Sequence, residues 1–122
     1  MTPMKDILTR WRLNSPTVAF VGAAPEGQQP PYVVFAEQTS MQQKAMPNVV
    51  LWTQTSVSFT AVGTTSTEAS DLGDLADLVF NQKAFGPVAD MVSTMRTTYF
   101  MDTPSLTGNR AWVTNIDYAI KH

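Results

Sequence analysis

The chain has 122 residues, 43% of them hydrophobic, which suits a single domain with a core of its own. It contains no cysteine, so disulfides, thiol nucleophiles and cysteine-ligated metals are excluded. The formal charge is −2 and the eight Lys and Arg residues are scattered, which argues against a surface that binds nucleic acid through clustered cations.

The first segment is predicted to be a helix. Thr2 suits the N-cap, and Pro3 suits the first helical position because its missing N–H would be unpaired there anyway. One apolar stripe follows at helical spacing, formed by Met4, Ile7, Leu8 and Trp11. We expect the helix to end at 14–16, because Pro16 disfavours a helical residue before it.

Two strands and a polar segment are predicted next. Residues 17–21 indicate a short strand, and residues 32–35 indicate a central one. Residues 37–48 are polar and rich in Gln and Met, and we interpret them as a loop. A structureless loop of this length is uncommon in a compact domain unless it binds something. Candidate contacts with a partner or another subunit are Gln38, Met41, Gln42, Gln43, Lys44 and Met46, although Met41 and Met46 could equally anchor the loop to the domain's own core.

A long strand over 49–62 is expected to lead into a second helix. Thr65 and Glu68 form a possible capping box, and the helix should extend to about Gln82. Its apolar positions keep helical spacing: Ala69, Leu72, Leu75, Ala76, Val79 and Phe80. We interpret Gly63 as a strand end and Gly73 as a position where the helix packs closely.

The last third is predicted to be a hairpin, with strands over 95–101 and 112–120 and a turn at 102–109. The fold class is therefore α+β, one domain over 1–122. The expected order is α-β-β-α-β-β with an extra short strand early. The sheet should have about four to five strands, antiparallel or mixed, with two helices on one face.

No catalytic constellation is visible. His122 is the only histidine and the last residue, and we expect it to be too loosely held for catalysis. Nucleotide-binding and hydrolase motifs are absent. No apolar run reaches the length of a membrane span, and the first residues lack a signal-peptide core. We therefore expect a soluble protein that is not an enzyme and needs no cofactor or metal.

Four carboxylates at a spacing of three form an acidic stripe on the second helix: Glu68, Asp71, Asp74 and Asp77. They could bind a hard cation, repel nucleic acid or meet a basic partner. The favoured interpretation is the solvated face of an amphipathic helix. A metal site is disfavoured because this spacing spreads the ligands along the helix.

The tryptophans and methionines are mostly expected in the core. Trp11, Trp52 and Trp112 lie in three separate predicted elements at apolar positions, so burial is favoured over a stacking platform. For Met91, Met95 and Met101 we expect core or hairpin packing. A small ligand-binding module that stacks its ligand on Trp52 or Tyr32 stays open, as does a metal enzyme that uses the acidic stripe.

The layout of the whole chain resembles a known family. An amphipathic helix precedes V-x-F-V-G and P-P-Y-V-V-F. A polar segment and the strand V-S-F-T-A-V-G then lead into T-T-S-T-E-A, and N-R-A-W-V-T-N-I-D-Y forms the last strand. This pattern is similar to the tail terminator (tail-completion) proteins of long-tailed bacteriophages and to neck proteins that share their fold. The family has no catalytic residues to transfer.

The resemblance implies a structural virion protein, assembled in the host cytoplasm. A homo-oligomeric ring, expected to be a hexamer, would end polymerisation of the tail tube at its head-proximal end. Its partners would be the tail tube protein and a head-completion or connector protein, while DNA passes through without specific binding. The acidic stripe would face the channel or a neighbouring subunit. A head-closure protein of the same particle is the alternative.

Overall fold

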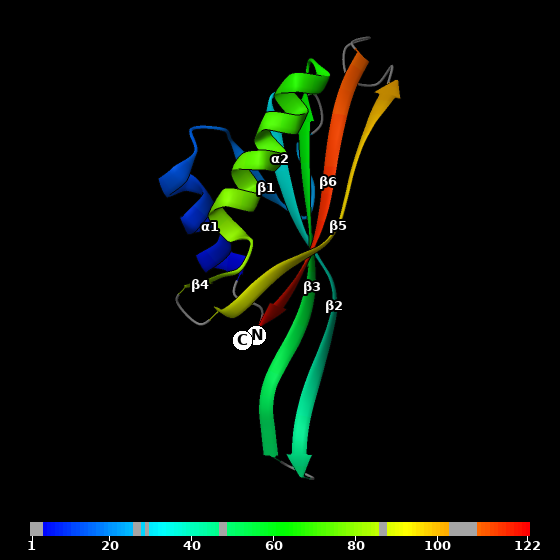
Figure 1. Cartoon of the computed structure of the whole chain (residues 1–122). Helices are drawn as coiled ribbons and strands as arrows, with labels where there is room; N and C mark the ends of the chain where they lie inside the picture. Colours follow the sequence, from blue (N-terminus) through cyan, green and yellow to red (C-terminus); the bar gives the residue numbers. More distant parts are fainter. Residues whose placement is uncertain (1–3, 26–27, 29, 47–48, 86–87, 103–109) are drawn as a thin grey trace.

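The computed structural model describes residues 4–25, 28, 30–46, 49–85, 88–102 and 110–122, and within these only the backbone of 39–46, 49–52, 89, 101–102 and 110. Two helices and six strands follow one another along the chain (Figure 1). They are α1 (Met4–Asn14), β1 (Ala19–Val21), β2 (Tyr32–Met46), β3 (Val49–Gly63), α2 (Ser66–Phe80), β4 (Lys83–Phe85), β5 (Val88–Asp102) and β6 (Arg110–Lys121).

The six strands form one twisted sheet in the order β1-β2-β3-β6-β5-β4. All neighbours are antiparallel except β1 and β2, which are parallel. The predicted α+β class and the two helices are confirmed. The expected count of four to five strands is too low by one. The predicted order α-β-β-α-β-β with an extra short strand early accounts for β1 but omits β4. The three residues of β4 carry too little pattern to be recognised from the sequence.

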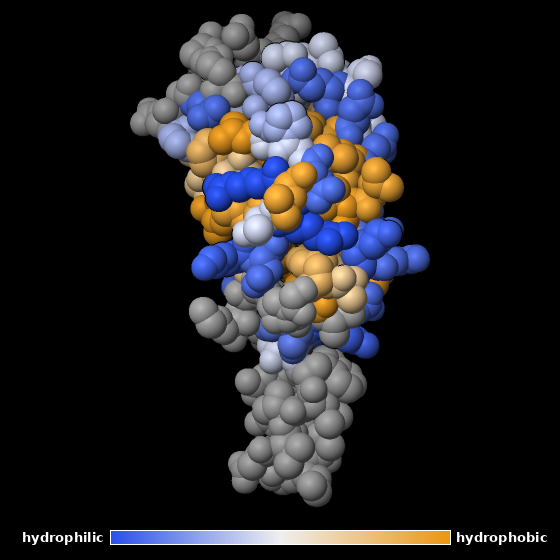
Figure 2. All heavy atoms as spheres, turned by 90° about the vertical axis from the view of Figure 1, so that its left-hand side faces the viewer, coloured by the Kyte–Doolittle hydropathy of each residue, from blue (hydrophilic) through white to orange (hydrophobic). Residues whose placement is uncertain are grey.

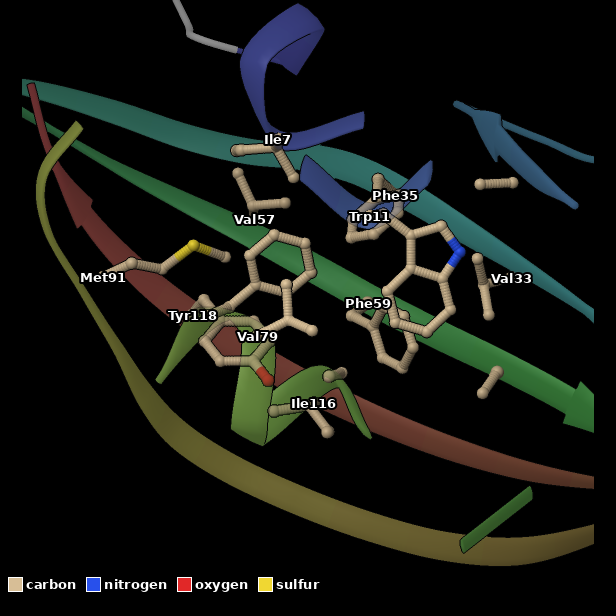
Figure 3. Close-up of a cluster of buried hydrophobic side chains, with 14 of the residues drawn as sticks. Ile7, Trp11, Val33, Phe35, Val57, Phe59, Val79, Met91, Ile116 and Tyr118 are labelled. Atoms are coloured by element: carbon tan, nitrogen blue, oxygen red, sulfur yellow. The ribbon is translucent and has the colours of Figure 1, made fainter. Parts of the chain in front are cut away.

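Both helices lie on the same side of the sheet (Figure 1). The main core fills the space between the helices and the sheet. Ile7 and Trp11 of α1 are fully buried. Ile7 lies beside Val57 of the sheet, and Trp11 packs against Phe35 and Phe59 (Figure 3). The Trp11 ring stacks on Phe80 of α2 with centroids 6.3 Å apart. The predicted apolar stripe of the first helix is therefore the surface that packs α1 onto the sheet, and the predicted burial of Trp11 is confirmed.

The start of α2 confirms the predicted capping box. The Thr65 hydroxyl accepts a hydrogen bond from the Glu68 backbone N–H at 3.1 Å. The Glu68 carboxylate accepts one from the Thr64 backbone N–H at 2.9 Å, so it reaches one residue further back than the motif predicts. A Cβ on Gly63 would lie 2.8 Å from the backbone N of Ala69. Gly63 thus permits the close approach of strand end and helix start.

The predicted loop over 37–48 is wrong for residues 37–46, which belong to β2. They pair with β3, for example Met41 with Gln54 and Gln43 with Trp52. The two strands project beyond the end of the sheet as a hairpin arm (Figure 1). The segment lacks the alternating pattern of a half-buried strand, but its backbone groups are paired by the ladder regardless of side-chain type. Residues 47–48 lie outside the described residues.

The end of the chain is also more ordered than expected. His122 exchanges two backbone hydrogen bonds of 2.9 Å with Thr53 of β3. Its imidazole Nε2 lies 2.9 Å from the Thr55 hydroxyl. The expectation that His122 is loosely held is therefore wrong, because β3 extends far enough to pair with it. The hairpin prediction also starts too late, since β5 begins at Val88.

Candidate interaction surfaces

None of the His, Asp and Glu side chains among the described residues form a group of three that could hold a metal ion. A hollow of about 460 Å³ lies beside the first turns of α2, lined by Thr17, Pro31, Thr65, Thr67, Glu68, Asp71, Leu72 and Leu75. Its lining combines three threonine hydroxyls with the carboxylates of Glu68 and Asp71, and the Glu68 carboxylate already accepts a hydrogen bond at the helix start.

The acidic stripe is largely occupied by contacts within the fold. Arg96 of β5 lies across α2, with Nη2 2.9 Å from an Asp74 oxygen and Nη1 3.1 Å from an Asp77 oxygen. The same Nη2 donates to the Ser70 carbonyl at 3.0 Å. Glu68 caps the helix start. Asp71 differs from these three, because it is exposed and forms no ion pair with the described residues.

Asp77 also binds the sheet beneath the helix. The Tyr118 hydroxyl donates a 2.8 Å hydrogen bond to the second Asp77 oxygen. Burial raises the pKa of Tyr118 above its ordinary value, and the hydrogen bond and negative charge of Asp77 raise it further. Tyr118 is 1% exposed, so this contact joins a core side chain to the acidic stripe. The stripe thus joins α2 to the sheet, which the sequence interpretation missed.

The predicted interface residues lie on the projecting arm or at its base. Gln38 is exposed and lies at a register shift between Glu37 and Thr39, where the ladder with β3 is irregular. The backbones of Met41, Gln42, Gln43, Lys44 and Met46 follow in β2. Their side chains lie outside the described residues. The structure therefore brings these positions together along one strand.

At each of the two lateral edges of the sheet, part of a long strand has no neighbouring strand among the described residues. On one side β1 pairs with residues 33–35 of β2. On the other, β4 pairs with Val88 and Met91 of β5, and the Ser93 N–H is bonded by the Asn81 side chain. Within the part of the chain that the structure describes, no strand pairs with the outer edge of β2 over 36–46 or of β5 over 94–99. We call these two segments the β2 open edge and the β5 open edge.

The β5 open edge has little protection against strand pairing beyond a register shift between Ser93 and Met95 at its start. Natural edge strands are commonly shielded by charged side chains, proline or bulges. The charge in this segment, Arg96, is neutralised by α2. Met95 is 62% exposed and Tyr99 44% exposed, so the predicted core or hairpin packing of Met95 is wrong. A signal was present, because M-R-T-T-Y is rich in strand-forming residues and carries one charge.

The proposed stacking platforms do not lie together. Tyr32 is 6% exposed and packs edge-on against Phe20, so its ring is covered. Trp112 packs on Phe100 with centroids 5.2 Å apart. The side chain of Trp52 lies outside the described residues. On the helix-covered side of the molecule, which Figure 2 views, hydrophilic and hydrophobic residues are interspersed on the surface.

A comparison with models of known protein families finds no match, and a comparison with curated proteins finds none either. Among the described residues, neither helix is long and apolar enough to cross a membrane.

Proposed function

We propose that this protein is a structural subunit that assembles head-to-tail into a ring. The observation that carries the proposal is the pair of open edges on opposite sides of one sheet. Unpaired strand edges are templates for pairing with another chain. Two different edges on one subunit favour a heterologous contact, which forms a closed ring when the rotation between copies closes.

The resemblance of the sequence to tail terminator proteins suggests where in a phage particle this ring would lie. In that role it lies at the head-proximal end of a phage tail tube, stops tube polymerisation and joins the tail to the head. Its partners are then further copies of itself, expected to be six, the tail tube protein and a head-completion or connector protein. The hairpin arm, formed by the ends of β2 and β3 beyond β6, supports the proposal because it projects from the sheet (Figure 1).

The charge of the described surface is compatible with DNA passing through such a ring. Arg96, which lies across α2, forms ion pairs with two carboxylates. Clustered free cations would bind phosphate and hold the DNA, and the sequence has none. The protein then acts mechanically and has no chemical step.

The test is electron microscopy of a lysate from the parent phage with a nonsense codon early in this gene. Overlong tails beside unattached, DNA-filled heads are the expected result. Normal-length tails lying free beside heads would instead indicate a head-closure protein. Intact infectious virions would overturn the phage proposal and leave a small ligand-binding module as the alternative to pursue.

A further inference from the structure

We infer that the β5 open edge (94–99) of one copy pairs with the β2 open edge (36–46) of the next copy, so that one sheet continues from subunit to subunit. This inference deepens the proposed function and rests on it for the biological role of the contact. The occupant of each edge is thus a second copy of this chain. Each copy provides both halves of the contact, which an unrelated partner would not require.

The strand directions fit this pairing. β2 is antiparallel to β3, β3 to β6, and β6 to β5. β2 and β5 therefore run in opposite directions within one copy. When the next copy is added with its helices on the same side of the sheet, its β2 runs antiparallel to the β5 that it meets. The result is an antiparallel ladder, the arrangement used by all neighbours in this sheet except β1 and β2.

The two edges are also offset along the strands, and the offset has a geometric consequence. Val92, Ala119, Ser56 and Thr39 form one row across β5, β6, β3 and β2. The β5 open edge lies on one side of this row, and most of the β2 open edge lies on the other. Full overlap therefore requires each copy to shift along the strand direction. A regular stagger of this kind is what a sheet needs to close into a barrel with tilted strands.

The contact between Arg96 and α2 makes the β5 open edge suitable for pairing. Side chains on this strand alternate between the two faces, and Arg96 pairs with Ile116, a core residue on the helix-covered face. The guanidinium is thus directed to Asp74 and Asp77 rather than into solvent along the edge. The neighbouring Met95 and Tyr99 are exposed. A second strand that covers them would bury part of their apolar surface and so remove it from water.

A symmetric pairing of two β5 edges is the competing arrangement. It would also be antiparallel, but it ends at a dimer and leaves both β2 open edges unpaired. Pairing of β5 with β2 uses both edges and can continue to a ring. The two arrangements predict different crosslinks, and the absence of cysteine from the chain allows them to be distinguished cleanly.

The experiment uses the full chain with one introduced cysteine at a time and a bismaleimide long enough to span several residues along a strand. Thr97→Cys marks the β5 open edge, and Gln38→Cys or Gln42→Cys marks the β2 open edge. Leu78→Cys is the matched control, because Leu78 is 72% exposed and belongs to α2 rather than to either edge strand. Equal amounts of two variants are mixed at the highest soluble concentration and crosslinked.

We expect dimers from Thr97→Cys mixed with a β2-edge variant, and at least tenfold less product when Leu78→Cys replaces either one. A chain carrying both edge cysteines should give a ladder that stops at the closed ring. Dimers from Thr97→Cys alone, equal product with Leu78→Cys, or no product with either β2-edge variant would each overturn the inference.

A second pair of variants tests whether an added charge on the β5 open edge prevents the crosslinked ladder from forming. Met95→Lys places an edge-protecting charge on the β5 open edge, and Leu78→Lys makes the same exposed apolar-to-Lys change on α2. Added to the double-cysteine chain, Met95→Lys should reduce the ladder at least tenfold, and Leu78→Lys should leave it unchanged. Equal effects of the two substitutions would contradict pairing at this edge.

The outcomes separate this inference from the proposed function. A ladder needs no phage component, so a ladder together with intact virions from the nonsense mutant would retain the pairing and reject the tail role. Overlong tails without a ladder would retain the tail role and show that the ring forms through other surfaces.

Discussion

Arg96 of β5 and Asp77 of α2 are joined by an ion pair of 3.1 Å that fixes the helix across the sheet. Both side chains are about one-third exposed, at 31% and 30%, so water screens their attraction in part. The pair is reinforced because Arg96 also contacts Asp74 and the Ser70 carbonyl, and Asp77 also accepts from Tyr118. A small network thus connects a strand edge, a helix and the core.

Arg96→Met tests the contribution of this network to stability. The substitution keeps the apolar stem and removes the donors to Asp74, Asp77 and Ser70. We expect the free energy of unfolding to fall by about 1–2 kcal/mol, the usual range for hydrogen bonds to charged groups at a partly exposed site. Urea unfolding followed by circular dichroism measures it. Arg12→Met, at an exposed position of α1, is the control and should change stability by less than about 0.5 kcal/mol. If Arg96→Met changes the free energy of unfolding as little as Arg12→Met does, the network is energetically neutral.

Tyr118→Phe tests the alkaline pH dependence. The raised pKa keeps Tyr118 protonated in the folded state, while in the unfolded chain it ionises above about pH 10. The stabilisation is therefore complete below pH 10 and is lost as the pH rises further, by up to about 1.4 kcal/mol per pH unit. The variant should lose about 1 kcal/mol at neutral pH and show a shallower decline above pH 10. Denaturant titrations from pH 8 to 11 measure both, and parallel profiles for the two proteins would refute the assignment.

The helices and the core were predictable from the sequence because their patterns come from burial on one face. The stripe of Ile7 and Trp11 and the capping residues Thr65 and Glu68 are local signals, and the structure confirms them. The predicted strand over 49–62 is confirmed by β3, but the β2 half of the arm was missed because its pattern does not alternate. Its strand structure comes from pairing with β3, for example Gln43 with Trp52, and this information is not local to the segment.

The acidic stripe shows a second limit of sequence reasoning. The helical spacing correctly places Asp74 and Asp77 on one helix, but their partner Arg96 is 22 and 19 positions away in sequence. Nothing in the pattern of β5 indicates which face of the strand carries the arginine. The sequence around Met95 indicates a strand, but it does not show that the outer edge of this strand lacks a neighbour. An open edge depends on the length of the neighbouring strand, and β1 and β4 are three residues each.

Gly73→Ala should destabilise the protein despite the higher helix propensity of alanine. A Cβ on Gly73 would lie 2.7 Å from Thr114 Cγ2 and 2.9 Å from Arg96 Nη2. Thr114 is fully buried in the central strand β6 and cannot move aside easily. Overpacking costs about 1–3 kcal/mol, against a gain of about 1 kcal/mol from propensity, so we expect a net loss of up to about 2 kcal/mol in urea unfolding.

A compensating change tests the cause of that loss. Thr114→Ser removes the Cγ2 methyl and keeps the hydroxyl that lies 3.0 Å from the Thr98 hydroxyl. The Gly73→Ala and Thr114→Ser double variant should therefore be more stable than the sum of the two single effects predicts. Strict additivity would mean that the clash with Thr114 is not the cause.

His122→Gln tests the junction of the arm with the sheet. Burial lowers the pKa of His122, an effect that Glu37 partly opposes. Because the folded pKa lies below the unfolded value of about 6.5, the unfolded chain binds the proton more readily as the pH falls. This stabilisation is present above pH 6.5 and is lost as the pH falls through the folded pKa. Glutamine does not titrate, so the variant should lose less stability between pH 7 and 5, while an unchanged profile would exclude His122 as the titrating group.

Asp71→Lys is the sharpest test of the acidic stripe as a channel or intersubunit face. Reversal of Asp74 would also break its ion pair with Arg96, so a functional defect there could arise from the fold. Asp71 is exposed and forms no ion pair among the described residues, so its reversal should change stability by less than about 1 kcal/mol. If the stripe faces DNA or a neighbouring subunit, Asp71→Lys supplied in trans to the nonsense mutant should reduce infectious particles at least tenfold. Asp6→Lys, an exposed reversal on α1, is the control. Full rescue by both variants would place the channel and the subunit contacts elsewhere, and the acidic stripe would then be a stabilising feature of α2 alone.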